Sequence, residues 1–301
     1  MLTLTPEQIA AFRRVLDRLT PEDRARGDAL AGPAAAAAAA AASHWDFCLP
    51  ATAVDGLIGD GPANEATAEV RRGLIARWAL ALPERVAALA LPPQSLELYP
   101  DHVDRLAAFL EAATGAYDDD YWAKDVRLSL ALSVPGAQTQ VIDLSSPLGA
   151  GGVVRNGRDG YGWSQTPQWI AAQGWRPWLE VHTEARHLSD FTEAGWDRAW
   201  STAAAILKTR PHMAGMIGSS WFYDPPLETI SPRLTYLRVN PLKNGAFLLH
   251  QGPAEIHSQR AAASSPTRRA MIESGEYTPR SWIVAWPRKA LIRWAEARGA
   301  I

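Results

Sequence analysis

The part of this sequence richest in groups that could do chemistry is only nine residues long. It contains two imidazoles, two carboxylates and one guanidinium, contributed by His182, Glu184, Arg186, His187 and Asp190. The alternating pattern before them predicts a strand over residues 178–182, and residues 190–193 form a capping-box pattern that predicts the start of a helix. Because ligands of open α/β sheets usually bind where a strand ends and a helix begins, we expect a functional site here.

An imidazole or a carboxylate at such a position can act as a general base. His182 and Glu184 are the two candidates, because proton abstraction needs a group whose pKa lies near the working pH. A purely structural interpretation stays open, in which Asp190 caps the following helix and Arg186 forms an ion pair with Glu184. The residue types alone do not decide between a catalytic loop and a polar structural loop.

A second wall for a pocket is expected where the strand predicted over residues 213–223 ends. Tyr223 and Asp224 follow two serines and a tryptophan there, a mixture of polar and aromatic groups that suits a binding site. We therefore include both among the candidate catalytic residues. The alternative is a strand with a buried tryptophan that stops at an Asp-Pro turn. Ser219 and Ser220 do not lie in a Gly-x-Ser-x-Gly pattern, so nothing supports a hydrolase elbow.

Arginines gather in the last quarter of the chain around a predicted helix start at Ser265-Pro266. Serine at the cap and proline in the first turn leave backbone donors free, and nearby guanidinium groups add positive charge. Arg260, Arg268 and Arg269 are therefore candidate ligands for the phosphates or carboxylates of an anionic small molecule. The alternative is a solvated helix that carries surface arginines.

Some of the same side chains fit a different chemistry. Non-haem Fe(II) enzymes need two imidazoles and one carboxylate on one face, with open positions for oxygen and a cosubstrate. His182 and Glu184 form a His-x-Glu pair, and His250 or His257 would supply the second imidazole. An arginine after these histidines would then hold 2-oxoglutarate. A third possibility is a non-catalytic protein that binds a small anion or regulates a partner.

The elements that must position these residues divide the chain into a helical N-terminal region, residues 1–115, and a mixed α/β core, residues 116–301. Capping patterns at Thr5 and Thr20 predict the first two helices. Alternating or apolar segments predict strands over residues 126–134, 139–144, 178–182, 213–223, 234–239, 246–250 and 281–286. The glycine-rich residues 149–162 are expected to form a surface loop. The fold class is therefore α+β or mixed α/β.

The order of elements over residues 126–250 resembles the core of the GNAT acyltransferases. In that family a strand, the loop after it and the start of the next helix bind acyl-CoA. Residues 239–246, which include Asn240 and Asn244, are similar to a late asparagine-containing stretch of the same family. The family's Gln/Arg-x-x-Gly-x-Gly/Ala loop is absent, and residues 186–191 read Arg-His-Leu-Ser-Asp-Phe instead.

The resemblance implies an acyl-CoA-dependent transferase that acts on a small amine. His182 or Glu184 would be its general base. The cofactor phosphates would be held by Arg186, Arg260, Arg268 and Arg269.

Composition narrows the classes of protein. The formal net charge is -2 and 21% of the 301 residues are charged, which does not favour a nucleic-acid partner. The one cysteine, Cys48, excludes an internal disulfide and suits a reducing compartment, so we expect a cytoplasmic protein without a membrane segment. Thirteen tryptophans are many for this length; most are expected in the core and at helix seams, although some could line a site for a sugar or an aromatic ligand. The oligomeric state is left open.

Overall fold

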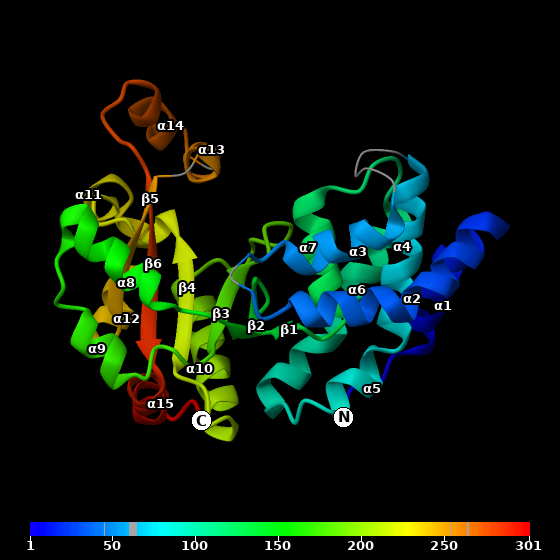
Figure 1. Ribbon diagram of the computed structural model, residues 1–301, viewed down its shortest axis with the longest axis horizontal. Helices are drawn as coiled ribbons and strands as arrows, with labels where there is room; N and C mark the ends of the chain where they lie inside the picture. Colours follow the sequence, from blue (N-terminus) through cyan, green and yellow to red (C-terminus); the bar gives the residue numbers. More distant parts are fainter. Residues whose placement is uncertain (45, 60–64, 254, 264) are drawn as a thin grey trace. The chain divides into compact units, whose positions relative to one another are not determined.

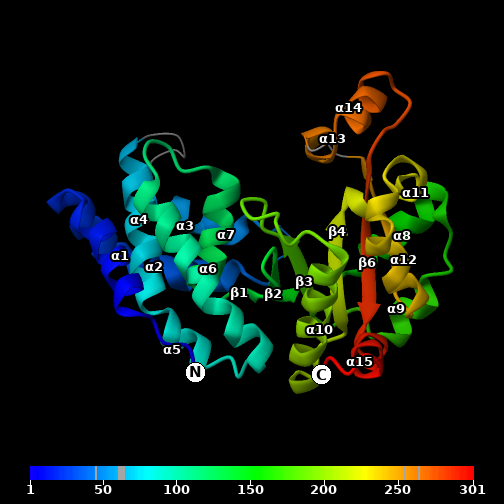
Figure 2. The same cartoon turned by 180° about the vertical axis from the view of Figure 1, so that it is seen from behind.

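A computed structural model gives the fold, and it describes residues 1–44, 46–59, 65–253, 255–263 and 265–301 (Figures 1 and 2). The chain forms two compact units. The helical unit comprises Met1–Ser146 and Glu184–Leu188, and the sheet unit comprises Pro147–Thr183 and Ser189–Ile301. The mixed α/β class predicted from the sequence is confirmed. One expected helix start, Asn64, lies outside the described residues.

The helical unit begins as its caps predict. The Thr5 hydroxyl accepts a hydrogen bond from the backbone N–H of Gln8, and Oε1 of Gln8 accepts one from the backbone N–H of Thr5. The Thr20 hydroxyl likewise accepts from the backbone N–H of Asp23 at the start of the second helix. The elements of this unit are α1 (Pro6–Asp17), α2 (Pro21–Ala41), α3 (Leu49–Ile58), α4 (Glu65–Leu80), α5 (Leu82–Ala87), α6 (Pro93–Ala112), α7 (Asp119–Ser129), β1 (Ser133–Pro135) and β2 (Gln140–Ser146).

The expected strand over residues 126–134 is wrong for most of its length, because α7 continues to Ser129 and only β1 is extended. Asp118 caps α7 by accepting from the backbone N–H of Tyr121. Nearly every residue from Trp122 to Pro135 is buried, so an alternating pattern there does not distinguish a helix from a strand. β1 pairs with β2 in antiparallel register, with Ser133 opposite Asp143.

The sheet unit is built on four strands in the order β3, β4, β6, β5. β3 runs parallel to β4, whereas β6 is antiparallel to both of its neighbours. Its elements are α8 (Ala150–Asn156), η1 (Gly157–Tyr161), α9 (Thr166–Ala171), β3 (Trp178–Thr183), α10 (Glu193–Thr209), β4 (Gly215–Ser220), η2 (Trp221–Tyr223), α11 (Leu227–Ile230), η3 (Pro232–Leu234), α12 (Tyr236–Lys243), β5 (Phe247–Pro253), α13 (Glu255–Ala263), α14 (Pro266–Glu273), β6 (Arg280–Pro287) and α15 (Arg288–Ala297).

Helices cover both faces of these four strands (Figures 1 and 2). On one face, α8 and α9 pack on an apolar cluster that includes Trp178, Ile217 and Leu249. On the other face, the tryptophans of α10, β6 and α15 form a contiguous aromatic group, and Trp200 lies 5.7 Å from Trp286 between ring centroids. Both faces are therefore buried, and alternation along each strand assigns its side chains to one face or the other.

Three other expectations for this unit are corrected. Residues 234–239 do not form a strand, because Leu234 ends η3 and residues 236–243 form helix α12. Residues 149–162 are not a surface loop throughout, because Val153 of α8 is buried against the sheet. The helix expected after residues 190–193 exists as α10, but Thr192, not Asp190, is its cap.

We expect Gly215→Ala to destabilise the sheet unit. A methyl group at Gly215 would lie 2.2 Å from the backbone oxygen of Trp286, and backbone cannot rotate away as a side chain can. The free energy of unfolding should fall by about 3 kcal/mol, measured by urea denaturation. Gly151→Ala, in a helix with nothing within 4 Å of the added methyl, is the matched control and should be neutral or slightly stabilising. Equal stability of the two variants would contradict the packing argument.

Candidate functional site

The parallel strands β3 and β4 stop pairing before their carboxyl ends. Their ladder joins Leu179 with Met216 and Glu180 with Ile217, and in this described stretch it goes no further. β4 pairs with β6 along its whole length, as far as Ser220, so the ladder is interrupted on the β3 side alone. Backbone amides in the last three residues of each strand are consequently not paired with one another. Backbone groups at the ends of parallel strands are the kind that an extended ligand with amide groups pairs with.

The start of α10 lies beyond the end of β3 and is unusually tight. Thr192 accepts a hydrogen bond from the backbone of Gly195 at 3.1 Å. A methyl group at Gly195 would lie 2.0 Å from the backbone oxygen of Asp190, so only glycine fits there. The Asp190 side chain binds Arg198 at 2.5 Å, which offsets its charge near the positive end of the helix.

On the face covered by α8 and α9, the sheet changes from apolar to polar towards the carboxyl ends of the strands. Glu180 and His182 share this face with Trp178 because strand side chains alternate. The Glu180 carboxylate is buried, and its Oε2 lies 3.8 Å from Nε2 of His182, whose side chain is 19% exposed. His182 is therefore a partly accessible imidazole with a carboxylate beside it.

The same polar edge continues across the next strands. Ser219 of β4 and Ser281 of β6 both donate their hydroxyl hydrogens to Oε1 of Gln251, at 2.5 and 2.7 Å. We call Glu180, His182, Ser219, Gln251 and Ser281 the polar row. An amide and two hydroxyls in one cluster offer donors and acceptors to a polar ligand without adding charge.

Tyr223 and Asp224, expected as catalytic residues, follow β4 directly. The Tyr223 hydroxyl lies against Gly218, where a methyl group would be 2.6 Å from it. Burial raises the pKa of Tyr223, and the nearby Glu180 carboxylate and Tyr236 raise it further, so the phenol stays protonated at neutral pH. Asp224 is buried and accepts hydrogen bonds from three groups, Tyr277, the Arg280 backbone and Trp282, which holds the turn together.

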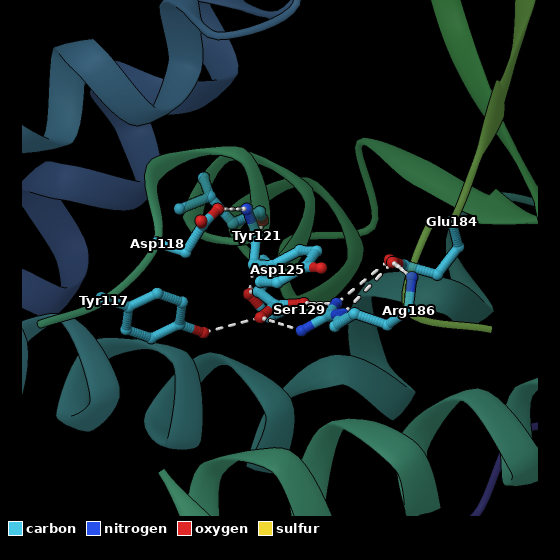
Figure 3. A network of polar contacts seen from close by, with 8 residues as sticks. Tyr117, Asp118, Tyr121, Asp125, Ser129, Glu184 and Arg186 are labelled. Atoms are coloured by element: carbon cyan, nitrogen blue, oxygen red, sulfur yellow. Dashed lines mark hydrogen bonds and ion pairs between the residues drawn. The ribbon is translucent and has the colours of Figure 1, made fainter. Parts of the chain in front are cut away.

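Glu184 and Arg186 lie in the helical unit, where they form a buried ion network with Asp125 of α7 (Figure 3). Arg186 contacts Asp125 at 2.6 Å and Glu184 at 3.0 Å. The Tyr117 hydroxyl donates to the other Asp125 oxygen at 2.6 Å. The expected pairing of Arg186 with Glu184 is present, but Asp125 was not foreseen as its second partner.

The guanidinium of Arg186 is also held between two aromatic rings, at 4.7 Å from the centroid of Phe109 and 4.6 Å from that of Tyr121. Burial alone would raise the pKa of Glu184, but hydrogen bonds and charge from Arg186 outweigh it and lower the pKa. A carboxylate with a lowered pKa is a weak base, so this environment favours His182 over Glu184 in that role.

The three expected cofactor arginines of the C-terminal segment differ in exposure. Arg260 on α13 and Arg269 on α14 are exposed. Arg268 is buried; its Nε donates to the Ala261 oxygen, Nη1 donates to Ser231, and the guanidinium lies over the Trp221 ring. Arg268 therefore holds α14 in place, and the charge offered to solvent comes from its two neighbours.

The histidines expected for an iron site are dispersed. His250 is buried on β5 and its Nδ1 lies 2.7 Å from Asp159, while His257 is half-buried on α13. Burial and the charge of Arg260 lower the pKa of His257. Across the residues with described positions, no three His, Cys, Asp or Glu side chains are grouped to share a metal ion. The iron interpretation thus gains no support from the geometry.

Sequence reasoning overlooked Glu180, Asp125, Gln251 and Ser281. Glu180 was within reach of a simple rule, because residues two apart in a strand share a face and His182 was already singled out. The others come from segments that are distant in sequence from residues 178–190. No local pattern marks such partners.

Comparisons with known proteins bear on the fold. It is similar to the crystal structure of an acyltransferase, a tryptophan-to-alanine variant of Orf11* in complex with octanoyl-CoA. The TM-score is 0.54 at 13% sequence identity, and the match covers 95% of this chain and 90% of that one. A second solved structure, an acyltransferase in complex with CoA and 10C-Teicoplanin, has a TM-score of 0.49 at 14% identity and the same coverage. At such low identity the likeness concerns the fold.

No protein-family model matches the sequence, and no curated protein does so either. Among the described helices, none has both the length and the apolar character needed to cross a bilayer.

Asp125→Asn is expected to destabilise the helical unit. It leaves the guanidinium of Arg186 mostly buried without its closest charge partner, and breaking such a pair costs about 3 kcal/mol. Urea denaturation followed by fluorescence measures the loss. Glu97→Gln on the exposed side of α6 removes a carboxylate charge without a buried partner, and should change stability by about 0.5 kcal/mol or less. A similar change in the two variants would show that the network adds nothing.

Proposed function

We propose that this protein transfers an acyl group from an acyl-CoA thioester to an amine. One observation carries the proposal. The fold, which is similar to that of an acyltransferase crystallised with octanoyl-CoA, contains parallel strands that separate at their carboxyl ends, next to a partly accessible histidine. The GNAT resemblance of the sequence agrees with this, since strand β3, the following loop and α10 occur in the order that the family uses for its cofactor.

The carboxyl ends of β3 and β4 suit the pantetheine arm of CoA. That arm is extended and carries two amide groups, and the register between the two strands stops at Glu180 and Ile217. The thioester would then lie near Gly218 of β4, where the Tyr223 hydroxyl occupies the space that a larger side chain at Gly218 would take.

The general base in this proposal is His182. Its imidazole is partly exposed, and Glu180 beside it stabilises the imidazolium that forms when a proton is taken up. Glu184 is the weaker candidate because Arg186 occupies both of its oxygens. The remaining members of the polar row would bind polar groups of the acceptor.

The bond changes balance as follows. The amine nitrogen attacks the thioester carbonyl and a C–N bond forms, while His182 takes a proton from the nitrogen. The C–S bond breaks, and the leaving CoA thiolate takes up a proton from solvent. His182 returns its proton to solvent, so an amide and free CoA are the products.

For the phosphates of CoA, the start of α10 offers backbone donors and a positive dipole, while the carboxylates of Asp190 and Glu193 oppose an anion. Arg198 neutralises the first of these. The exposed arginines Arg260 and Arg269 are the remaining candidates for phosphate contacts. Arg268 and Arg186 would act indirectly, because their donors are used within the protein.

Octanoyl-CoA is expected to raise the melting temperature of the purified protein. A ligand at 100 times its Kd adds about 2.7 kcal/mol to stability, because it binds the folded state alone. Differential scanning fluorimetry with octanoyl-CoA, CoA and free octanoate separates the stabilisation due to the CoA part of the ligand from that due to its acyl chain. The control is Gly195→Ala, whose misplaced α10 start should weaken the response to CoA more than the response to octanoate. No shift with octanoyl-CoA or CoA would overturn the proposed function.

His182→Gln should abolish most turnover without loss of cofactor binding. Removing a general base lowers the rate by about 10²–10⁴-fold, whereas His182 makes no contact with the CoA phosphates in this proposal. Release of CoA thiol from octanoyl-CoA in the presence of a panel of primary amines gives the rate, and calorimetry gives the Kd. Exposed His212→Gln is the matched control and should retain full activity. A His182→Gln enzyme with unchanged turnover would remove His182 from the mechanism.

A further inference from the structure

Residues 150–176 of the sheet unit form a layer over the face of the sheet that carries Trp178. We call it the outer layer; it comprises α8, η1, α9 and the turns that follow (Figure 1). Its inner side is apolar, with Val153 buried and Trp169 and Ala172 partly buried. Val153, Trp169 and Ala172 pack against the cluster around Trp178 and Leu249. Because these residues fix the inner side, the neighbouring positions along the same short helices must face away from the sheet.

That outward side is also apolar. Val154 is 40% exposed, Trp163 55%, Ile170 53% and Trp175 62%. Wherever the structure describes a tryptophan, Trp163 and Trp175 alone are exposed, and both belong to the outer layer. Isolated exposed apolar residues are ordinary, but four large ones in one short layer indicate a surface that binds something.

Both tryptophans are held in place rather than left loose. The ring of Trp163 lies on the backbone of Gly157, where an added methyl group would be 2.4 Å from it. Trp175 stands edge-on to Trp169, with ring centroids 5.8 Å apart. A ligand that contacts these rings therefore does not have to order them first, which reduces the entropic cost of binding.

The charge of the outer layer identifies the ligand. Arg155, Arg158 and Arg176 are exposed, and Asp159 is the one acidic residue of the segment. The Asp159 carboxylate lies 2.7 Å from Nδ1 of His250, so its nearest partner is this imidazole. The layer thus presents tryptophans and arginines with little opposing charge, in a protein whose net charge is -2.

We propose that the outer layer binds the surface of an anionic phospholipid membrane. Tryptophan rings are favoured at the boundary between headgroups and acyl chains, and each arginine near an anionic leaflet contributes about 1 kcal/mol of attraction. The contact is peripheral, and the inner side of the layer stays on the sheet. The inference does not rest on acyl transfer; its one link to the polar row is the hydrogen bond that Nη1 of Arg155 donates to the backbone oxygen of Gln251.

Sedimentation with lipid vesicles tests the proposal on the full-length protein. Binding to vesicles of phosphatidylcholine with one quarter phosphatidylglycerol should be at least tenfold tighter than binding to phosphatidylcholine alone, and should weaken with salt. Trp163→Ala with Trp175→Ala should reduce the affinity at least tenfold. Neutralising Arg155, Arg158 and Arg176 to Gln should remove the preference for anionic vesicles. Neutralising three exposed cations elsewhere in the sheet unit, Arg233, Lys289 and Arg293, should leave it unchanged.

A readout on the unmodified protein guards against variants that fail to fold. Tryptophan fluorescence should shift to the blue with anionic vesicles and be quenched by brominated lipid. Three outcomes would overturn the proposal. They are an absence of vesicle binding, preferential binding of a single-stranded oligonucleotide through the same tryptophans, and dimerisation that the double tryptophan variant abolishes. Loss of CoA binding in His182 or Gly195 variants bears on the proposed function alone.

Discussion

The buried ion network of Arg186 determines how the chain passes from β3 to α10. Glu184–Leu188 belong to the helical unit, although the strand before them and the helix after them belong to the sheet unit. Apolar packing does not explain this, since Leu188 is 50% exposed. The contacts of Arg186 do explain it. Its guanidinium binds two carboxylates between two aromatic rings, and without it the buried Asp125 carboxylate would have no positive partner. Charge therefore fixes the position of this segment.

The network also decides which groups are free for chemistry. Arg186 is bound by both Glu184 and Asp125, so neither Glu184 nor Arg186 offers an unengaged charge. His182, two residues earlier, belongs to the sheet unit and has Glu180 beside it. The cluster that begins at His182 is thus divided after Thr183. Glu184 and Arg186 support the fold, whereas His182 is the residue proposed as the general base. The physical reason is strand alternation up to Thr183 and ion pairing beyond it.

The sequence predicts those features that depend on local physics. Caps at Thr5 and Thr20, the strands β3 and β4 and the helix α10 follow from patterns a few residues long. Residues 126–134 were misread because burial on all sides hides the helical period. Distant partners such as Asp125 for Arg186 and Gln251 for Ser219 depend on the tertiary fold, which no window of the sequence contains.

Arginines and tryptophans, both numerous here, gain their roles from burial rather than from type. Arg268 was expected to hold an anion, yet it lies over Trp221 and binds Ser231, so its charge supports the fold. In the outer layer, by contrast, two tryptophans and three arginines are exposed to solvent. The aromatic ring of Trp163 rests on glycine backbone and turns its surface to solvent, beside arginines that have no acidic partner in the same segment except Asp159. A protein that had only to bury its aromatic residues would not hold these rings rigidly at its surface, since exposing an apolar ring costs about 25 cal/mol for each Å² left in water.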